Sequence, residues 1–385
     1  MYQLFFLSFL SVFSLSFIAN GSARPPSLGD AYALKAREAI LMDYDTGTVL
    51  YEKNADAPTY PSSMTKIMTI YLAFERLKDG RMTLQSPIPI SVKAWKTGGS
   101  RMFLEPNTHV PLEELMRGVI IQSGNDASVA LAEGLGGIEE NFAREMTEKA
   151  HALGAKNTEF KNAHGLFEAG HITTVRDLAL ISRSMVKEFP QYYPYFGEVR
   201  YTHNGITQPN RNPLLSIPHL KADGIKTGMT DEGGYGLVGS AEQDGRRLIV
   251  VVNGLLSEKE RATVSEQLLS WGFREFENRT FPRSGTVIAQ VKTWLGVDPT
   301  VDLIVHEGLT LVLAKDKNKN IAMEAIYKEP LEAPIQKGQV AGILRITLPD
   351  NSTREIPMTA AATVEQVSPF KRIFSALNYI IWGHS

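Results

Sequence analysis

The chain has 385 residues, with 40 lysines and arginines against 42 aspartates and glutamates, a hydrophobic fraction of 43% and no cysteine. This length favours two folded units, and the near-neutral charge gives no general attraction to nucleic acid. The absence of cysteine excludes disulfides, thiolate metal sites and a cysteine nucleophile. Folding must therefore rely on the hydrophobic core alone.

The first residues read as a targeting segment. Residues 1–23 contain no charged side chain, and the apolar run from Leu4 to Ile18 is followed by Gly-Ser-Ala at 21–23. Fifteen residues of helix span roughly 22 Å, short of the bilayer core of about 30 Å. We therefore predict a signal peptide over residues 1–23, with an uncleaved anchor as the alternative.

The next part of the chain mixes strand and helix patterns. Turn residues between short apolar runs predict two β-hairpins, and apolar residues at helical spacing predict helices. The expected hairpins cover residues 39–51 and 235–253, and the expected helices cover residues 64–77, 112–135, 138–153 and 257–276. We therefore predict one α+β domain over residues 24–282.

The pattern changes after residue 282. Short apolar runs alternate with turn signals, which predicts a small all-β, sandwich-like domain over residues 283–367 without a catalytic constellation. From Phe370 to Ile381 apolar residues recur at helical spacing, with Lys371 and Arg372 on the other face. We predict an amphipathic helix over residues 368–385 that lies in a membrane surface; packing on the protein's own core is the alternative.

Three short patterns occur in order along the chain. The first, Ser63-Met64-Thr65-Lys66, would put a hydroxyl and an amine on one helix face. Burial beside other cations would lower the pKa of such a lysine and let it act as a base. The second is Ser123-Gly124-Asn125, and the third is Lys226-Thr227-Gly228, where glycine permits close backbone approach.

Each pattern alone is weak. Ser-x-x-Lys recurs at 184–187 and 368–371, and Lys-Thr-Gly recurs at 96–98, whereas Ser-x-Asn occurs once. Only one set falls in order on a helix, an inter-helix segment and a strand. The joint occurrence is therefore the informative signal.

With these motifs the chain resembles the penicillin-binding proteins and serine β-lactamases, and more closely the low-molecular-mass D-alanyl-D-alanine carboxypeptidases. The resemblance runs through the stretches 61–66, 123–128, 162–166, 210–212 and 223–228. It implies a transpeptidase-like α+β domain, with an antiparallel sheet flanked by helices and a helical part, followed by a small all-β domain. One departure is Met229, where many members carry an aromatic residue or histidine.

The resemblance also implies a mechanism. Ser63 would attack the carbonyl of the penultimate D-alanine, Lys66 would take its proton, and Ser123 would relay a proton to the departing D-alanine. The backbone N–H groups of Ser63 and Met229 would form the oxyanion hole, beside Gly228.

Further residues would hold the substrate. Asn125 would bind the peptide amide, Lys226 would supply positive potential, and Thr227 with Arg211 would hold the terminal carboxylate. For Arg211 the alternative is an ordinary solvated side chain, and for His164, in a loop flanking the site, it is a structural role. The histidines at 109, 151, 203, 219 and 306 show no paired ligand spacing, so we expect no metal or other cofactor.

The expected function is removal of the terminal D-alanine from peptidoglycan pentapeptide stems, with β-lactams as ligands, on the outer face of the cytoplasmic membrane. A D,D-endopeptidase acting on cross-links uses the same chemistry and remains an alternative. A serine β-lactamase is disfavoured, because the loop at 160–172 offers only Glu168 and no Glu-x-x-Leu-Asn. A wall-binding module with a dead site is disfavoured by the intact motifs.

Overall fold

The computed structural model describes residues 35–315, 321–348 and 352–369. The predicted signal peptide and nearly all of the predicted anchor helix lie outside these residues. The described chain divides into two compact units between Glu275 and Phe276. None of its helices is both long and apolar enough to cross a membrane.

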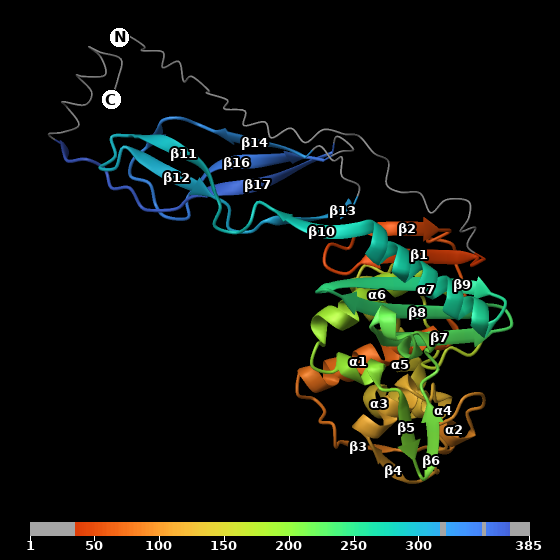
Figure 1. The fold of residues 1–385 in the computed structure, drawn as a ribbon. Coiled ribbons are helices and arrows are strands. Elements are labelled where there is room, and N and C mark those ends of the chain that lie inside the picture. The colour runs from red at the N-terminus through yellow and green to blue at the C-terminus, as the bar shows by residue number, and fades with distance from the viewer. Residues whose placement is uncertain (1–34, 316–320, 349–351, 370–385) are drawn as a thin grey trace. The chain divides into compact units, whose positions relative to one another are not determined.

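The first unit is built on an antiparallel sheet of five strands in the order β2-β1-β9-β8-β7 (Figure 1). Both hairpins expected from the sequence are confirmed, because β1 pairs with β2 and β8 pairs with β9. The strands are β1 (Glu38–Asp43), β2 (Val49–Lys53), β7 (Ala222–Thr230), β8 (Gly234–Gln243) and β9 (Arg246–Leu255).

Helices cover both faces of this sheet. Side chains alternate along a strand, so neighbouring residues of β1 face opposite sides. Ile40 and Met42 belong to the buried core that also contains α1 (Lys66–Lys78). Leu41 faces α7 (Glu258–Glu275), where a Cβ added to Gly272 would come 2.6 Å from Leu41 Cδ2.

The remaining helices form the helical part of the first unit (Figure 1). The helical pattern over residues 112–135 is interrupted, because α3 ends at Ile120 and α4 begins at Asn125. Small strand pairs, β3 with β4 and β5 with β6, complete the unit. The elements are α2 (Val92–Lys96), α3 (Leu112–Ile120), α4 (Asn125–Gly136), α5 (Glu139–Ala152), α6 (Val175–Glu188), β3 (Pro87–Pro89), β4 (His109–Pro111), β5 (Arg200–His203), β6 (Ile206–Pro209), η3 (Tyr193–Gly197), η4 (Pro213–Ser216) and η5 (Pro218–Leu220).

The second unit is all-β. A sheet of six strands runs in the order β14-β16-β17-β12-β11-β15, and β10 pairs with β13. Leu313 of β13 shares a buried core with Leu303 and Leu344 of the larger sheet. The predicted fold class, α+β followed by all-β, is confirmed. The strands are β10 (Phe276–Phe281), β11 (Val287–Trp294), β12 (Thr300–Ile304), β13 (Leu309–Ala314), β14 (Ala322–Tyr327), β15 (Leu331–Glu332), β16 (Val340–Thr347) and β17 (Thr353–Ala360).

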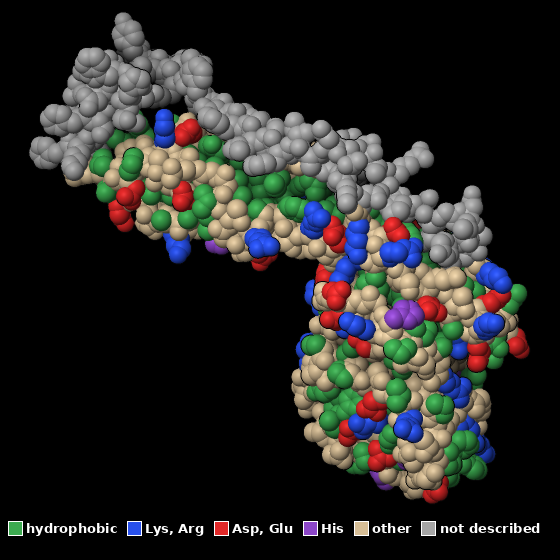
Figure 2. Space-filling view, viewed as in Figure 1, with side chains coloured by type: hydrophobic (Ala, Val, Ile, Leu, Met, Phe, Trp, Pro, Cys, Tyr) green, Lys and Arg blue, Asp and Glu red, His purple; other side chains and the backbone are tan. Residues whose placement is uncertain are grey.

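Charged side chains of both signs are interspersed over the visible face of the first unit (Figure 2). Opposite charges that lie close together largely cancel beyond a Debye length, about 8 Å at physiological salt. This face therefore presents no single-sign field, in keeping with the formal net charge of −2.

Candidate active site

Ser63, the expected nucleophile, lies in a short 3-10 helix, η2 (Ser62–Thr65), directly ahead of α1. Lys66 is the first residue of α1. Positions three apart in a helical backbone share a face, and the Lys66 Nζ lies 3.0 Å from Ser63 Oγ. The neighbouring Ser62 hydroxyl points elsewhere and donates to Thr230 Oγ1 at 3.1 Å.

Lys66 is completely buried among hydrogen-bond acceptors. Its Nζ also lies 2.8 Å from Asn125 Oδ1 and 2.6 Å from the carbonyl oxygen of His164. Burial, followed by the charge of Lys226 and of one arginine, lowers the pKa of Lys66 well below its usual value. A neutral amine keeps two N–H donors for these acceptors and offers its lone pair to the Ser63 hydroxyl, which makes it a base for that proton.

The second motif lies between α3 and α4. Ser123 is buried in this connection with φ at +59°, a left-handed conformation that interrupts the helical run. Asn125 opens α4, where its Nδ2 donates to the carbonyl of Gly98 and its backbone N–H donates to the carbonyl of Ser100, both at 2.7 Å. Asn125 thus links the buried lysine to this segment, and both ends of its amide are engaged within the protein.

Asp126, which sequence analysis did not single out, fixes the same segment. Its fully buried carboxylate accepts from the backbone N–H groups of Met102, Phe103 and Leu104 at 2.8, 2.9 and 3.2 Å. An aspartate in the first turn of a helix is also favoured by the helix dipole. The one sequence feature that could have pointed to Asp126 as a buried acceptor is its position directly after Ser-Gly-Asn.

The third motif lies in β7, which packs tightly against η2. A Cβ added to Gly228 would come 3.0 Å from Ser62 Cβ, so glycine is needed at this approach. The contact brings Lys226 and Thr227, both buried, alongside the turn that carries the nucleophile. The side chain of Met229 is directed outward and is 52% exposed.

A second residue missed by sequence analysis is Arg261 of α7, a buried arginine next to β7. Its Nη1 donates to the carbonyl of Gly228 at 3.4 Å, and its guanidinium lies over the ring of Tyr235. Burial, followed by the charges of Arg211 and Arg261, lowers the pKa of Lys226 to about 7. Arg261 belongs to no short motif, so no sequence signal marked it.

Arg211 lies in the connection between β6 and η4 and reaches the same site from an exposed position. Its Nη1 donates to Ser100 Oγ at 2.7 Å. Its charge contributes to the lowered pKa of both Lys66 and Lys226. The permanent charge of the Arg211 guanidinium suits a carboxylate ligand.

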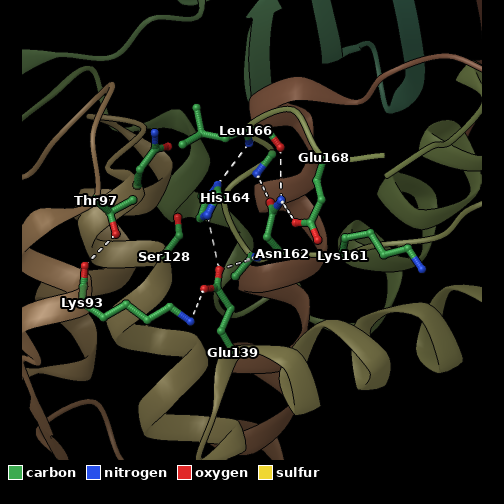
Figure 3. A network of polar contacts seen from close by, with 12 residues as sticks. Lys93, Thr97, Ser128, Glu139, Lys161, Asn162, His164, Leu166 and Glu168 are labelled. Carbon is green, nitrogen blue, oxygen red and sulfur yellow. Dashed lines mark hydrogen bonds and ion pairs between the residues drawn. The ribbon is translucent and has the colours of Figure 1, made fainter. Parts of the chain in front are cut away.

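His164 enters the site through its main chain. Its carbonyl accepts from Lys66, whereas its imidazole turns toward Glu139 of α5 (Figure 3), with Nε2 3.4 Å from Glu139 Oε1. Nδ1 accepts from the backbone N–H of Leu166 at 3.1 Å. Burial, followed by the charges of Lys66 and Lys93, lowers the pKa of His164 to about 3, so the ring is neutral near pH 7.

The same loop packs closely against the nucleophile turn. Gly165 has φ at +84°, and an added Cβ would come 1.8 Å from the carbonyl oxygen of Ser62. His171 was also missed by sequence analysis. Its Nε2 lies 2.8 Å from Thr65 Oγ1, and its Nδ1 accepts from the backbone N–H of Lys161 at 3.0 Å. These contacts set the distance between the loop and η2.

Two family models match the chain. One, described as D-alanyl-D-alanine carboxypeptidase, covers residues 22–256, and the other, described as Penicillin-binding protein 5, C-terminal domain, covers residues 276–366. The D-alanyl-D-alanine carboxypeptidase DacC of Escherichia coli is 38% identical over 95% of this chain and 92% of its own length.

Solved structures agree with these matches. Penicillin-binding protein 5 from Haemophilus influenzae superposes with a TM-score of 0.76 at 35% identity, covering 89% of this chain and 100% of the other. Penicillin-Binding Protein D2 from Listeria monocytogenes, solved in the cefotaxime-bound form, superposes with a TM-score of 0.58 at 29% identity over 62% of this chain and 98% of its own. The transpeptidase-like fold expected from the sequence is confirmed, and the chain belongs to the D-alanyl-D-alanine carboxypeptidase family of penicillin-binding proteins.

Proposed function

We propose that this protein is a serine-type carboxypeptidase that removes the terminal D-alanine from peptidoglycan pentapeptide stems. The observation that carries the proposal is the fully buried Lys66 with its Nζ 3.0 Å from Ser63 Oγ. A neutral amine next to a hydroxyl is the pairing that activates a serine nucleophile. Family membership supplies the substrate class.

Acylation follows from this pairing. Ser63 Oγ attacks the carbonyl carbon of the penultimate D-alanine while its proton passes to Lys66 Nζ. The oxyanion lies between the N–H groups of Ser63 and Met229, and one such donor is worth about 2.7–4 kcal/mol of transition-state stabilisation. The C–N bond then breaks, the proton on Lys66 passes through Ser123 to the leaving amine, and the acyl group remains on Ser63.

Deacylation completes the cycle. Water gives a proton to the neutral amine of Lys66 and attacks the ester carbonyl, the ester C–O bond breaks, and Ser63 regains its proton. The products are the shortened peptide acid and the regenerated enzyme. In a β-lactam the amine stays tethered to the acyl group and cannot diffuse away, so the acyl-enzyme with penicillin is expected to persist.

The terminal carboxylate of the substrate is held by the cationic end of the site. Arg211 and Thr227 bind it, and Lys226 contributes positive potential. In support of this, the charge of Arg211 lowers the pKa of both Lys66 and Lys226. Asn125 binds the peptide amide through the second N–H of Nδ2, while the first keeps its hydrogen bond to the carbonyl of Gly98.

Product analysis tests this proposal. The purified protein is incubated with a pentapeptide that ends in D-Ala-D-Ala and with a cross-linked peptide dimer, and released D-alanine and monomers are quantified. The expected result is D-alanine from the pentapeptide, none from Ser63→Ala, and near wild-type release from Ser184→Ala, a serine in another Ser-x-x-Lys pattern on α6. Cleavage of the dimer alone would instead identify an endopeptidase.

We propose secretion through residues 1–23 and peripheral attachment to the outer face of the cytoplasmic membrane through residues 368–385. The support is the sequence pattern of both segments. The division into residues 24–282 and 283–367 also stays a prediction. Truncation before Ser368 should give a soluble, active enzyme; if it still sediments with membranes, the anchor lies elsewhere in the chain.

A further inference from the structure

We propose that Glu139, at the start of α5, is a positioning residue that holds Lys66 in its catalytic place. This inference rests on the proposed function, in which Lys66 is the base for Ser63. Glu139 is only 6% exposed, and a buried carboxylate is stable only when paired. Its two oxygens serve two different segments of the site (Figure 3).

Oxygen Oε1 binds the loop that follows α5. It accepts from the backbone N–H of Ala163 at 3.1 Å and lies 3.4 Å from Nε2 of His164. Because Nδ1 of this neutral ring accepts from the N–H of Leu166, the ring proton is on Nε2, the nitrogen that faces Glu139. One carboxylate oxygen therefore fixes two consecutive loop residues.

Helix α1 binds the same two residues. Thr69 Oγ1 donates to the carbonyl of Ala163 at 2.7 Å, and Lys66 Nζ donates to the carbonyl of His164 at 2.6 Å. Residues 163 and 164 are thus held between α1 and Glu139. If the carboxylate is lost, the loop can shift and the His164 carbonyl no longer defines where the lysine nitrogen lies.

Oxygen Oε2 binds the opposite side of the site. It pairs with Lys93 of α2 at 2.9 Å. Helix α2 leads directly to Gly98, whose carbonyl accepts from Nδ2 of Asn125, and Oδ1 of the same amide accepts from Lys66. Both acceptors that orient the lysine, the His164 carbonyl and the Asn125 amide, are therefore connected to Glu139.

These contacts keep the flexible side chain of Lys66 in one conformation, with its nitrogen next to Ser63. A lysine side chain has up to about 2 kcal/mol of rotamer entropy to lose, so fixed acceptors are needed to keep it in one conformation. A misplacement of about 1 Å can cost roughly 100-fold in rate. Glu139 should therefore affect the acylation step and not the binding of the ligand.

The test is the acylation of Glu139→Gln by a fluorescent penicillin, resolved into the binding constant and the first-order constant k2 at saturation. The glutamine keeps the shape, loses the charge and turns an N–H group to Lys93. We expect k2 to fall by at least about tenfold with the binding constant within about twofold. Glu140→Gln is the matched control, because Glu140 also faces Lys93 but is 71% exposed.

A merely structural role would lower the labelled fraction and leave k2 of the labelled molecules unchanged, because k2 does not depend on how much protein is folded. Lys93→Met, at a half-exposed position, severs only the α2 connection and should lower k2 by a smaller factor. If the wild type is not labelled, the proposed function fails. If it is labelled and Glu139→Gln keeps k2 within about twofold, the positioning role is wrong.

Discussion

Replacing Gly165 by alanine should slow the acylation of Ser63 about 100-fold, because it displaces the loop that positions Lys66. A Cβ on Gly165 would come 1.8 Å from the carbonyl oxygen of Ser62. Carbon and oxygen need roughly 3.4 Å, so the loop or η2 must retreat by more than about 1 Å. That shift acts on the 2.6 Å contact between Lys66 Nζ and the carbonyl of His164, the residue next to the glycine.

Gly170→Ala is the matched control in the same loop. Both glycines have positive φ, +84° and +81°, so both alanines pay a left-handed backbone cost of about 1–2 kcal/mol. At Gly170 the nearest atom is Cε of the flexible Lys161 side chain at 3.1 Å, which can move away. The difference between the two variants therefore isolates the contact with η2.

The assay is the saturating rate of labelling by a fluorescent penicillin, together with thermal unfolding. A misplacement of about 1 Å costs roughly 100-fold, so Gly165→Ala should label about 100 times more slowly, while Gly170→Ala stays within about twofold of wild type. Both should lose about 1–2 kcal/mol of stability from the backbone term. Equal labelling rates in the two variants would refute the argument that this loop positions the base.

Three further outcomes follow from buried contacts and charge. Asp126→Ala strips three N–H groups of their acceptor, two of them buried, and should cost roughly 2–6 kcal/mol in urea unfolding, because each buried unsatisfied donor costs about 1–3 kcal/mol. The exposed Asp231→Ala should cost less than about 0.5 kcal/mol, and equal losses would contradict the assignment. Burial, then the charges of His164 and other neighbours, lowers the pKa of His171 to about 3, so the unfolded state binds more protons and stability falls as pH drops from about 6.5 towards 3, by about 1.4 kcal/mol per pH unit. His171→Gln should lose this part of the pH slope, and an unchanged slope would show that the ring is not kept neutral. Arg211→Ala should raise KM for a peptide with a free terminal carboxylate and not for its amide; equal effects would exclude a carboxylate contact.

The parts of the site that the sequence predicted are those set by local geometry. The spacing of Ser63 and Lys66 implies one helix face, and the pattern around Lys226 implies a strand. These features need only the backbone periodicity of a few residues. The structure has the serine in a 3-10 turn rather than in the α-helix itself, a difference at the helix start that spacing alone does not reveal.

The parts that the sequence did not predict depend on contacts between distant segments. Glu139 contacts the backbone of Ala163, which lies 24 residues away in the chain, and Arg261 lies 33 residues from the carbonyl that it contacts. The sequence analysis placed Ser123 in an inter-helix segment, but it did not give the bounds of the break, because apolar residues continue at helical spacing on both sides of it. The His164 ring faces Glu139, which no motif marked. The sequence therefore identified His164 as a site residue but did not show that it contacts Lys66 through its main-chain carbonyl.

The most direct test of the central claim is to locate the covalent bond that penicillin forms. After incubation with benzylpenicillin, tryptic digestion gives one peptide over residues 54–66 that contains both Ser62 and Ser63, and fragment masses distinguish the two hydroxyls. The Lys66 contact predicts the adduct on Ser63, and its loss in Ser63→Ala. An adduct on Ser62, on Ser123 or on any residue of the Ser63→Ala protein would contradict the assignment of the nucleophile.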